Sequence, residues 1–159
     1  MATLPQLTVE DATKLDAILG AFHARAEAHA VLLIDKGGFL LAHSGDDARF
    51  DLTTIAALSS GAFLANQSIA QLVGEPNFNS VYQQGENFSL FIHDVDEHSL
   101  LVTIFPVNAS AGAVKYFVTA TAARIAEQMQ LARDRNPTGG YDLSVMNVAD
   151  TELLFRQKA

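Results

Sequence analysis

The chain has 159 residues and a mass of 17.1 kDa, a length that suits one domain of ordinary size with a buried core. Hydrophobic residues make up 49% of the sequence and charged residues 18%, a composition that excludes a disordered chain. Eighteen acidic residues against ten basic ones give a net charge of -8 without a basic cluster, so we expect no nucleic-acid partner.

The first predicted elements are an amphipathic helix and a β-hairpin. Thr8 followed by Asp11 forms a capping box, and a helical repeat then predicts a helix over about residues 9–28. The next segment, AVLLIDKGGFLLAHS, contains two apolar runs of strand length around a Lys-Gly-Gly turn. Because these runs do not alternate cleanly, we expect both strands to be covered on two faces or to pair centrally.

A helix without charges is predicted next, in the segment DLTTIAALSSGAFLANQSIAQLVGE. Asp51 is its expected N-cap, and Gly74 and Pro76 mark its end. At 100° per residue, one apolar stripe is expected to pack on the sheet, and it comprises Ile55, Leu58, Ala62, Ala65, Ile69 and Leu72. A second stripe is small and uncharged, and it comprises Ala57, Gly61, Leu64 and Ser68.

The second stripe has a low desolvation cost, so other chains are expected to cover it. The alternative from the residues alone is a fully internal helix in a monomer. Phe63 lies away from both stripes and is expected to mark the flank where two copies of the helix meet.

Three strands and a final helix complete the predicted domain. The strands cover residues 78–84, 88–95 and 99–105, and the helix covers residues 111–135. The first of these strands carries no charge or proline that would protect a sheet edge, which indicates a pairing partner. Residues 136–140 form a linker and residues 141–159 a tail, so the domain spans residues 9–135.

The order of these segments resembles the roadblock (dynein light chain) family, and within it the bacterial members of cell polarity and gliding motility. The resemblance covers roughly residues 9–133 and rests on LLIDKGGFLLAHSG, LSSGAFLANQSIAQLVGE and the YQQGE turn. It implies an α+β fold, a roadblock-like α-ββ-α-βββ-α sandwich whose five-stranded antiparallel sheet has helices on its faces. It also implies a homodimer with paired third strands, in which the expected contacts are Phe63, Asn79, Val81 and Gln83.

The resemblance further implies that the middle helix docks a small Ras-like GTPase and stimulates its GTP hydrolysis. The face expected to bind the GTPase is the second stripe, Ala57, Gly61, Leu64 and Ser68, although Leu64 is larger than the residue that the family often has there. Leu153, Leu154 and Phe155 in the tail are expected to make a further contact. The alternatives are a scaffold that tethers a GTPase or another protein without activating it, and a sensory module that binds a small molecule.

No chemistry of the protein's own is expected, so we predict neither an enzyme nor a cofactor. Cysteine is absent, which suits the reducing cytoplasm where we expect the protein, and neither a signal peptide nor a membrane span is recognisable. A metal site at the turn that holds His93, Asp94, Asp96 and His98 is considered but not favoured over an ordinary polar turn. Arg49 is the one candidate for an arginine inserted into a GTPase, against the alternative of a solvated loop charge.

Overall fold

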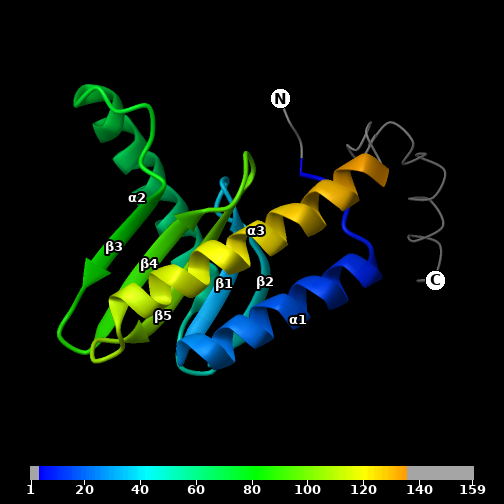
Figure 1. Cartoon of the computed structure of the whole chain (residues 1–159), viewed down its shortest axis with the longest axis horizontal. Helices are drawn as coiled ribbons and strands as arrows, with labels where there is room; N and C mark the ends of the chain where they lie inside the picture. The colour runs from blue at the N-terminus through cyan, green and yellow to red at the C-terminus, as the bar shows by residue number, and fades with distance from the viewer. Residues whose placement is uncertain (1–3, 136–159) are drawn as a thin grey trace, which may run out of the picture.

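The computed structural model describes residues 4–135, and it confirms the predicted α+β roadblock sandwich (Figure 1). In chain order the elements are α1 (Val9–Ala26), β1 (Ala30–Asp35), β2 (Leu40–Gly45), α2 (Leu52–Leu72), β3 (Ser80–Gln84), β4 (Phe88–Asp94), β5 (Ser99–Pro106) and α3 (Ala111–Arg135). The predicted elements all form, and their boundaries differ from the prediction by about two residues at most.

The caps predicted for the first two helices are present. The Thr8 hydroxyl accepts a hydrogen bond from the Asp11 amide at 3.2 Å, and the Thr8 amide donates to the Asp11 carboxylate at 2.8 Å. In α2 the Asp51 carboxylate accepts from the Thr54 amide at 3.1 Å. Each cap satisfies amides that a helix N-terminus otherwise leaves without a partner, so the local sequence defines where both helices begin.

The five strands form one antiparallel sheet in the order β2-β1-β5-β4-β3. The prediction of a central, covered strand is confirmed for β1, whose residues 30–34 are buried. The same prediction for β2 is wrong, because β2 lies at an edge of the sheet formed by the described residues, and its own residues are half-buried or exposed. The strand that pairs with the other side of β1 is β5, which comes from a distant part of the sequence.

Helices cover both faces of the sheet. Figure 1 shows α1 and α3 side by side across one face, and α2 lies against the other. Alternate residues of β1 separate the two cores, since Val31 and Leu33 pack with α1 and α3, whereas Leu32 and Ile34 pack with α2. One face of the sheet is therefore covered by two helices and the opposite face by α2 alone. The last turns of α2 extend past the sheet.

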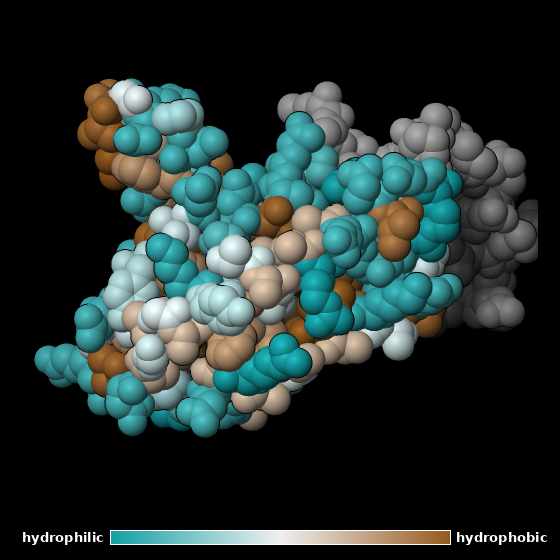
Figure 2. All heavy atoms as spheres, viewed as in Figure 1, coloured by the Kyte–Doolittle hydropathy of each residue, from teal (hydrophilic) through white to brown (hydrophobic). Residues whose placement is uncertain are grey.

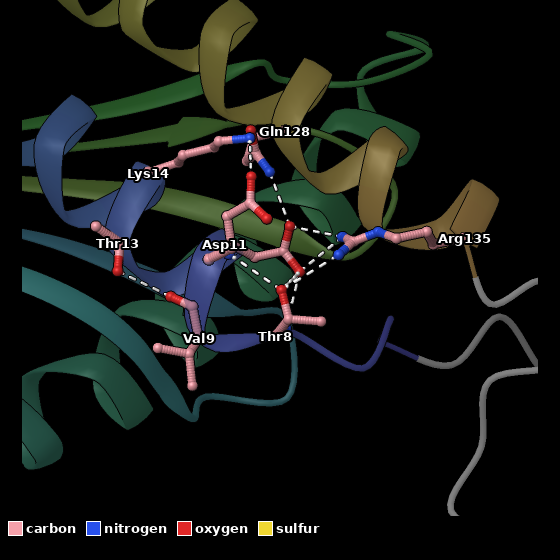
Figure 3. Close-up of polar contacts among 8 residues, drawn as sticks. Thr8, Val9, Asp11, Thr13, Lys14, Gln128 and Arg135 are labelled. Atoms are coloured by element: carbon pink, nitrogen blue, oxygen red, sulfur yellow. Dashed lines mark hydrogen bonds and ion pairs between the residues drawn. The ribbon is translucent and has the colours of Figure 1, made fainter.

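A half-buried ion pair joins the first turn of α1 to the last turn of α3 (Figure 3). The Arg135 guanidinium donates to both carboxylate oxygens of Asp11 at 2.6 and 2.7 Å, and Gln128 donates to the same carboxylate at 2.8 Å. Burial acts to raise the pKa of Asp11, but the hydrogen bonds from Arg135, Thr8 and Gln128 outweigh it and hold the pKa well below its usual value.

Candidate functional site

The face of α2 that packs on the sheet differs from the predicted one. Its buried residues are Leu52, Ala56, Ser59, Ser60, Phe63 and Ala70. Leu58, Ile69 and Leu72, which were expected to be buried, are instead 69%, 48% and 86% exposed. The helix is therefore rotated by more than a third of a turn from the predicted orientation.

Polar contacts to the hairpin explain this rotation. The buried Ser60 hydroxyl donates to the main-chain carbonyl of Lys36 in the β1–β2 turn. Gly38 in the same turn has φ +96°, and a Cβ there would lie 3.0 Å from the Ala57 Cα atom. The hairpin thus approaches α2 closely at small residues, a contact that a hydropathy pattern does not contain.

Phe63 belongs to the core of the domain and not to its surface. The side chain is 2% exposed and packs between α2 and the sheet, with the Lys36 ammonium 5.7 Å from its ring centroid. The prediction that Phe63 contacts a second copy is therefore corrected, because its own protomer covers the ring.

The stripe expected to be buried forms a separate surface, which we call the cleft stripe: Ile55, Leu58, Ala62, Ala65, Ile69 and Leu72. Its first three residues line a cleft of about 560 Å³ between α2 and the β3–β4 hairpin. The other apolar lining residues are Phe50, Phe88, Leu90 and Ile104, and the polar ones are Ser59, Gln83, Gln84 and Ser89. Figure 2 shows hydrophobic atoms gathered on the projecting end of α2, where Ile69, Leu72 and Val73 are exposed.

The second predicted stripe, called here the outer stripe, is exposed as expected: Ala57, Gly61, Leu64 and Ser68. It lies more than a third of a turn from the buried face of α2. Leu64 is 51% exposed, and the Ser68 hydroxyl donates to the Leu64 carbonyl at 3.3 Å. Since this hydroxyl is already bonded within the helix, covering the outer stripe desolvates few polar groups.

Strand β3 lies at an edge of the sheet, and its hydrogen-bond directions follow from its pairing with β4. The Asn79 carbonyl accepts from the Asp94 amide at 2.9 Å, and the Gly85 amide donates to the Phe88 carbonyl at 2.8 Å. Because directions alternate along an antiparallel strand, residues 79, 81, 83 and 85 face β4, whereas residues 80, 82 and 84 face the open edge.

The predicted contacts on β3 therefore need a correction. The backbone groups of Asn79, Val81 and Gln83 are already directed at β4, so they are not the groups that pair with another strand. The groups free to do so belong to Ser80, Tyr82 and Gln84. Val81 and Gln83 remain relevant through their side chains, since Val81 packs against the α2 core and Gln83 lines the cleft.

Arg49 lies at the border of the cleft. Its guanidinium stacks over the rings of Phe88 and Phe50, at 4.9 and 5.5 Å from their centroids. These contacts place the cation beside the apolar lining, while the residue itself is exposed, as expected of a solvated loop charge.

The polar residues around the β4–β5 turn have structural partners. Asp94 pairs with Lys36 at 2.8 Å, and Asp96 pairs with Arg133 at 3.0 Å while accepting bonds from the turn itself. Burial lowers the pKa of the neighbouring His93. Within residues 4–135, no group of metal-ligating side chains gathers in a way that would hold an ion. Over the same residues, no helix has the length and apolar character needed to cross a membrane.

The chain belongs to the Roadblock/LC7 domain family, since the sequence profile of that family matches residues 14–105. This fold is that of regulatory and adaptor domains. Within the family, the chain is similar to MglB of Myxococcus xanthus, with 28% identity, coverage of 80% of this chain and 96% of that one, and a TM-score of 0.75.

Two further solved structures are similar to this chain to about the same degree. The gliding protein MglB from Thermus thermophilus is 29% identical over 82% of this chain and 98% of that one, with a TM-score of 0.74. A structure described as MglB with a tetrameric arrangement is 30% identical over 83% and 99%, with a TM-score of 0.76. No curated protein sequence matches the chain. The predicted family and its bacterial branch are thereby confirmed.

Proposed function

We propose that this protein is a cytoplasmic homodimer that binds a small Ras-like GTPase of the MglA-like type and stimulates its GTP hydrolysis in bacterial cell polarity or motility. Membership of the Roadblock/LC7 family and similarity to MglB support a GTPase-associated regulator. The structural observation that carries the proposal is that α2 has no charged residue although much of its surface is exposed.

Two separate surfaces on α2 suit two partners. The cleft stripe faces the open β3 edge, where a second copy would extend the sheet and cover the apolar cleft. The outer stripe points away from the sheet and stays free when the cleft is covered. Large apolar side chains exposed on one helix are typical of interaction sites, and on α2 they are Leu58, Leu64, Ile69 and Leu72.

The proposed activation works by ordering the GTPase's own catalytic residues. A GTPase activator either inserts an arginine into its partner or positions groups that the partner already has. The outer stripe contains no arginine and no other charge, and Arg49 is held over Phe50 and Phe88 at the cleft. A small, uncharged surface is suited to contacting the switch segments of a GTPase and positioning their catalytic residues. It adds no charged group to the site of hydrolysis.

The test of this function is single-turnover GTP hydrolysis by an MglA-like GTPase from the same source, with and without the protein. Acceleration that depends on the concentration of the protein would support the proposal. Binding without acceleration would replace it by the scaffold function, and the absence of binding would refute both. Sedimentation of the same mixtures reports the binding.

Leu64→Glu is expected to lower the stimulation of GTP hydrolysis by about 10-fold or more, because it buries a carboxylate in the proposed GTPase contact. Leu131→Glu on α3 is the matched control, since Leu131 is 57% exposed and Leu64 51%. The measurement is hydrolysis rate against protein concentration, with circular dichroism as a check on folding. Equal stimulation by both variants would place the GTPase contact elsewhere.

A pair of proline variants tests the open edge of β3. Gln84→Pro removes an outward amide and is expected to weaken the dimer by about 10-fold while the protomer stays folded. Gln83→Pro removes an amide directed at β4 and is expected to destabilise the protomer by about 1–3 kcal/mol. Sedimentation and thermal unfolding separate these effects, and a Gln84→Pro protein with unchanged dimer affinity would argue against strand pairing.

The tail residues Leu153, Leu154 and Phe155 lie outside the described residues. Their contact with the GTPase stays a prediction from the sequence.

A further inference from the structure

A narrow groove lies between α1 and α3, on the face of the domain that α2 does not cover. Apart from two arginines, its lining combines apolar side chains with small ones: Ile18, Phe22, Phe117, Ala21, Ala120 and Thr121. Figure 2 shows this face, with pale and weakly hydrophobic atoms over the two helices. The groove holds about 40 Å³, far less than a typical small-molecule site, so it suits the side chains of a peptide segment.

The two arginines border the groove on opposite sides, Arg25 from α1 and Arg124 from α3. Both residues are exposed, and within residues 4–135 no carboxylate forms an ion pair with either of them. No acidic residue lines the groove, although the chain as a whole carries a net charge of -8. A segment that fits must therefore present an apolar stripe with an acid on each side of it.

The other arginines of residues 4–135 have partners inside the domain. Arg133 pairs with Asp96 and Arg135 pairs with Asp11, whereas Arg49 stacks over the ring of Phe88. The two guanidinium groups at the groove are thus the ones left for a further acidic group.

The part of the chain that follows α3 contains a segment of the required kind. We call residues 145–155, with the sequence VMNVADTELLF, the tail segment. It has no basic residue, and it alternates between apolar and acidic character. Short segments of this composition often bind as amphipathic helices in a groove.

A helical projection of the tail segment matches the groove. At 100° per residue, Met146, Ala149 and Leu153 fall within one narrow stripe. Asp150 and Glu152 lie about 200° apart on such a helix, one on each side of this stripe. An apolar stripe between two acids is complementary to an apolar groove between two arginines.

The length of the chain permits this contact within one molecule. From Arg124 to its end at Arg135, α3 extends about 17 Å. Residues 136–144 connect α3 to the tail segment and can span up to about 30 Å, so the chain can return along α3 to the groove. A segment attached in this way has an effective concentration on the order of millimolar, and docking of modest intrinsic affinity is then populated.

We propose that the tail segment docks as a helix in the groove between α1 and α3 of its own chain, with its apolar stripe over the groove and its two acids paired with Arg25 and Arg124. This docking requires no GTPase. It covers Leu153, one of the residues expected to contact the GTPase, so the docked and GTPase-bound positions of the tail are mutually exclusive.

Hydrogen exchange on the full-length protein, without any GTPase, tests the docking. The amides of residues 145–155 should exchange at least about 10-fold more slowly than in a free peptide of the same sequence. Arg25→Glu combined with Arg124→Glu should remove this protection, because like charges then face each other. Arg49→Glu combined with Lys115→Glu is the control, since it changes the net charge equally at exposed residues outside the groove.

Exchange of the charges tests the ion pairs. Asp150→Arg combined with Glu152→Arg should also remove the protection of residues 145–155. When these changes are introduced into the Arg25→Glu and Arg124→Glu protein, each pair re-forms with reversed polarity, and the protection should return. Protection that stays lost in this fourfold variant would overturn the proposed pairing.

Cysteine substitution tests whether the segment docks on its own chain. The sequence contains no cysteine, so two introduced thiols report one contact. A chain with both Ala21→Cys and Leu153→Cys should form an internal disulfide on mild oxidation, seen as loss of free thiols without a covalent dimer. Ala57→Cys with Leu153→Cys, placed on α2 instead, should keep its thiols. A disulfide between two chains would overturn docking within one chain.

The outcomes are separate from the proposed function. Residues 145–155 that exchange as fast as the free peptide, or protection that survives the double arginine substitution, would overturn the docking and leave the GTPase proposal unchanged. Conversely, a protein that shows the protection but does not stimulate GTP hydrolysis would retain the docking and lose the proposed activity.

Discussion

Replacing Leu58 by glutamate is expected to convert the proposed homodimer into a folded monomer. The side chain is 69% exposed in the protomer, so the charge should alter the stability of the isolated chain by no more than about 0.5 kcal/mol. In the proposed dimer the same position lies in the cleft that the second copy covers. An unpaired carboxylate buried there twice should weaken association by more than about 100-fold, which corresponds to about 3 kcal/mol.

Sedimentation velocity over a range of protein concentrations measures this effect. Leu131→Glu provides a control with the same chemical change at a residue of similar exposure on α3, and it should leave the dimer intact. If Leu58→Glu dimerises as well as the wild type, the cleft stripe is not the contact between copies. If it is monomeric and no longer stimulates a GTPase that Leu131→Glu still stimulates, activation requires the dimer.

Asp11→Asn is expected to lower the free energy of unfolding by about 2 kcal/mol at neutral pH. The carboxylate is 2% exposed, and both of its oxygens accept from Nη2 of Arg135, so the neutral amide leaves this guanidinium without its buried partner. Roughly half of the Arg135 side chain is exposed, and water therefore compensates part of the loss. Glu10→Gln is the control, because its pair with Lys14 is exposed to solvent and should contribute little to stability.

The effect of Asp11→Asn should depend on pH in one direction. The pKa of Asp11 is lowered in the folded state, so its ionised form contributes stability above its unfolded pKa of about 3.9, and this contribution is lost as the pH falls below that value. The stability difference between wild type and variant should therefore be largest near pH 7 and smaller near pH 3. Urea unfolding at both values measures it, and a difference independent of pH would contradict the assignment of the ion pair.

The element order could be predicted because its signals are local. The Thr8 and Asp51 caps, the glycines of the hairpin turns and the apolar periods of the strands each act within a few residues. Even the final helix, where KYFVTATA is compatible with a strand, follows from its longer apolar repeat. Local rules of this kind give boundaries without knowledge of the tertiary structure.

The orientation of α2 could not be predicted, because the helix is uncharged on every side. Because every face of α2 carries uncharged residues, the hydropathy pattern distinguishes these faces only weakly. The selection of the buried face depends on Ser60 bonding to Lys36 and on Gly38 approaching Ala57, contacts between distant segments. The same reason explains why the pattern alone places Phe63 at an interface.

The sequence also indicated the correct edge strand, but it could not show which backbone groups of that strand face outward. The lack of charge and proline in residues 78–84 is visible in the sequence, and β3 does lie at an edge of the sheet. Which amides face outward depends on the register with β4, and one residue of shift exchanges the two sets. The contact of Arg49 with Phe88 is equally non-local, since it joins the loop before α2 to β4.

The ion pair between Asp11 and Arg135 places the beginning of α1 beside the end of α3, so the two ends of the folded domain are neighbours. A domain with adjacent ends tolerates circular permutation, in which a short peptide joins the old ends and a loop is opened instead. Opening the β4–β5 turn would leave the cleft stripe, the outer stripe and the β3 edge continuous in the new chain. The architecture therefore permits the order of its segments to be changed without altering the surfaces proposed for its partners.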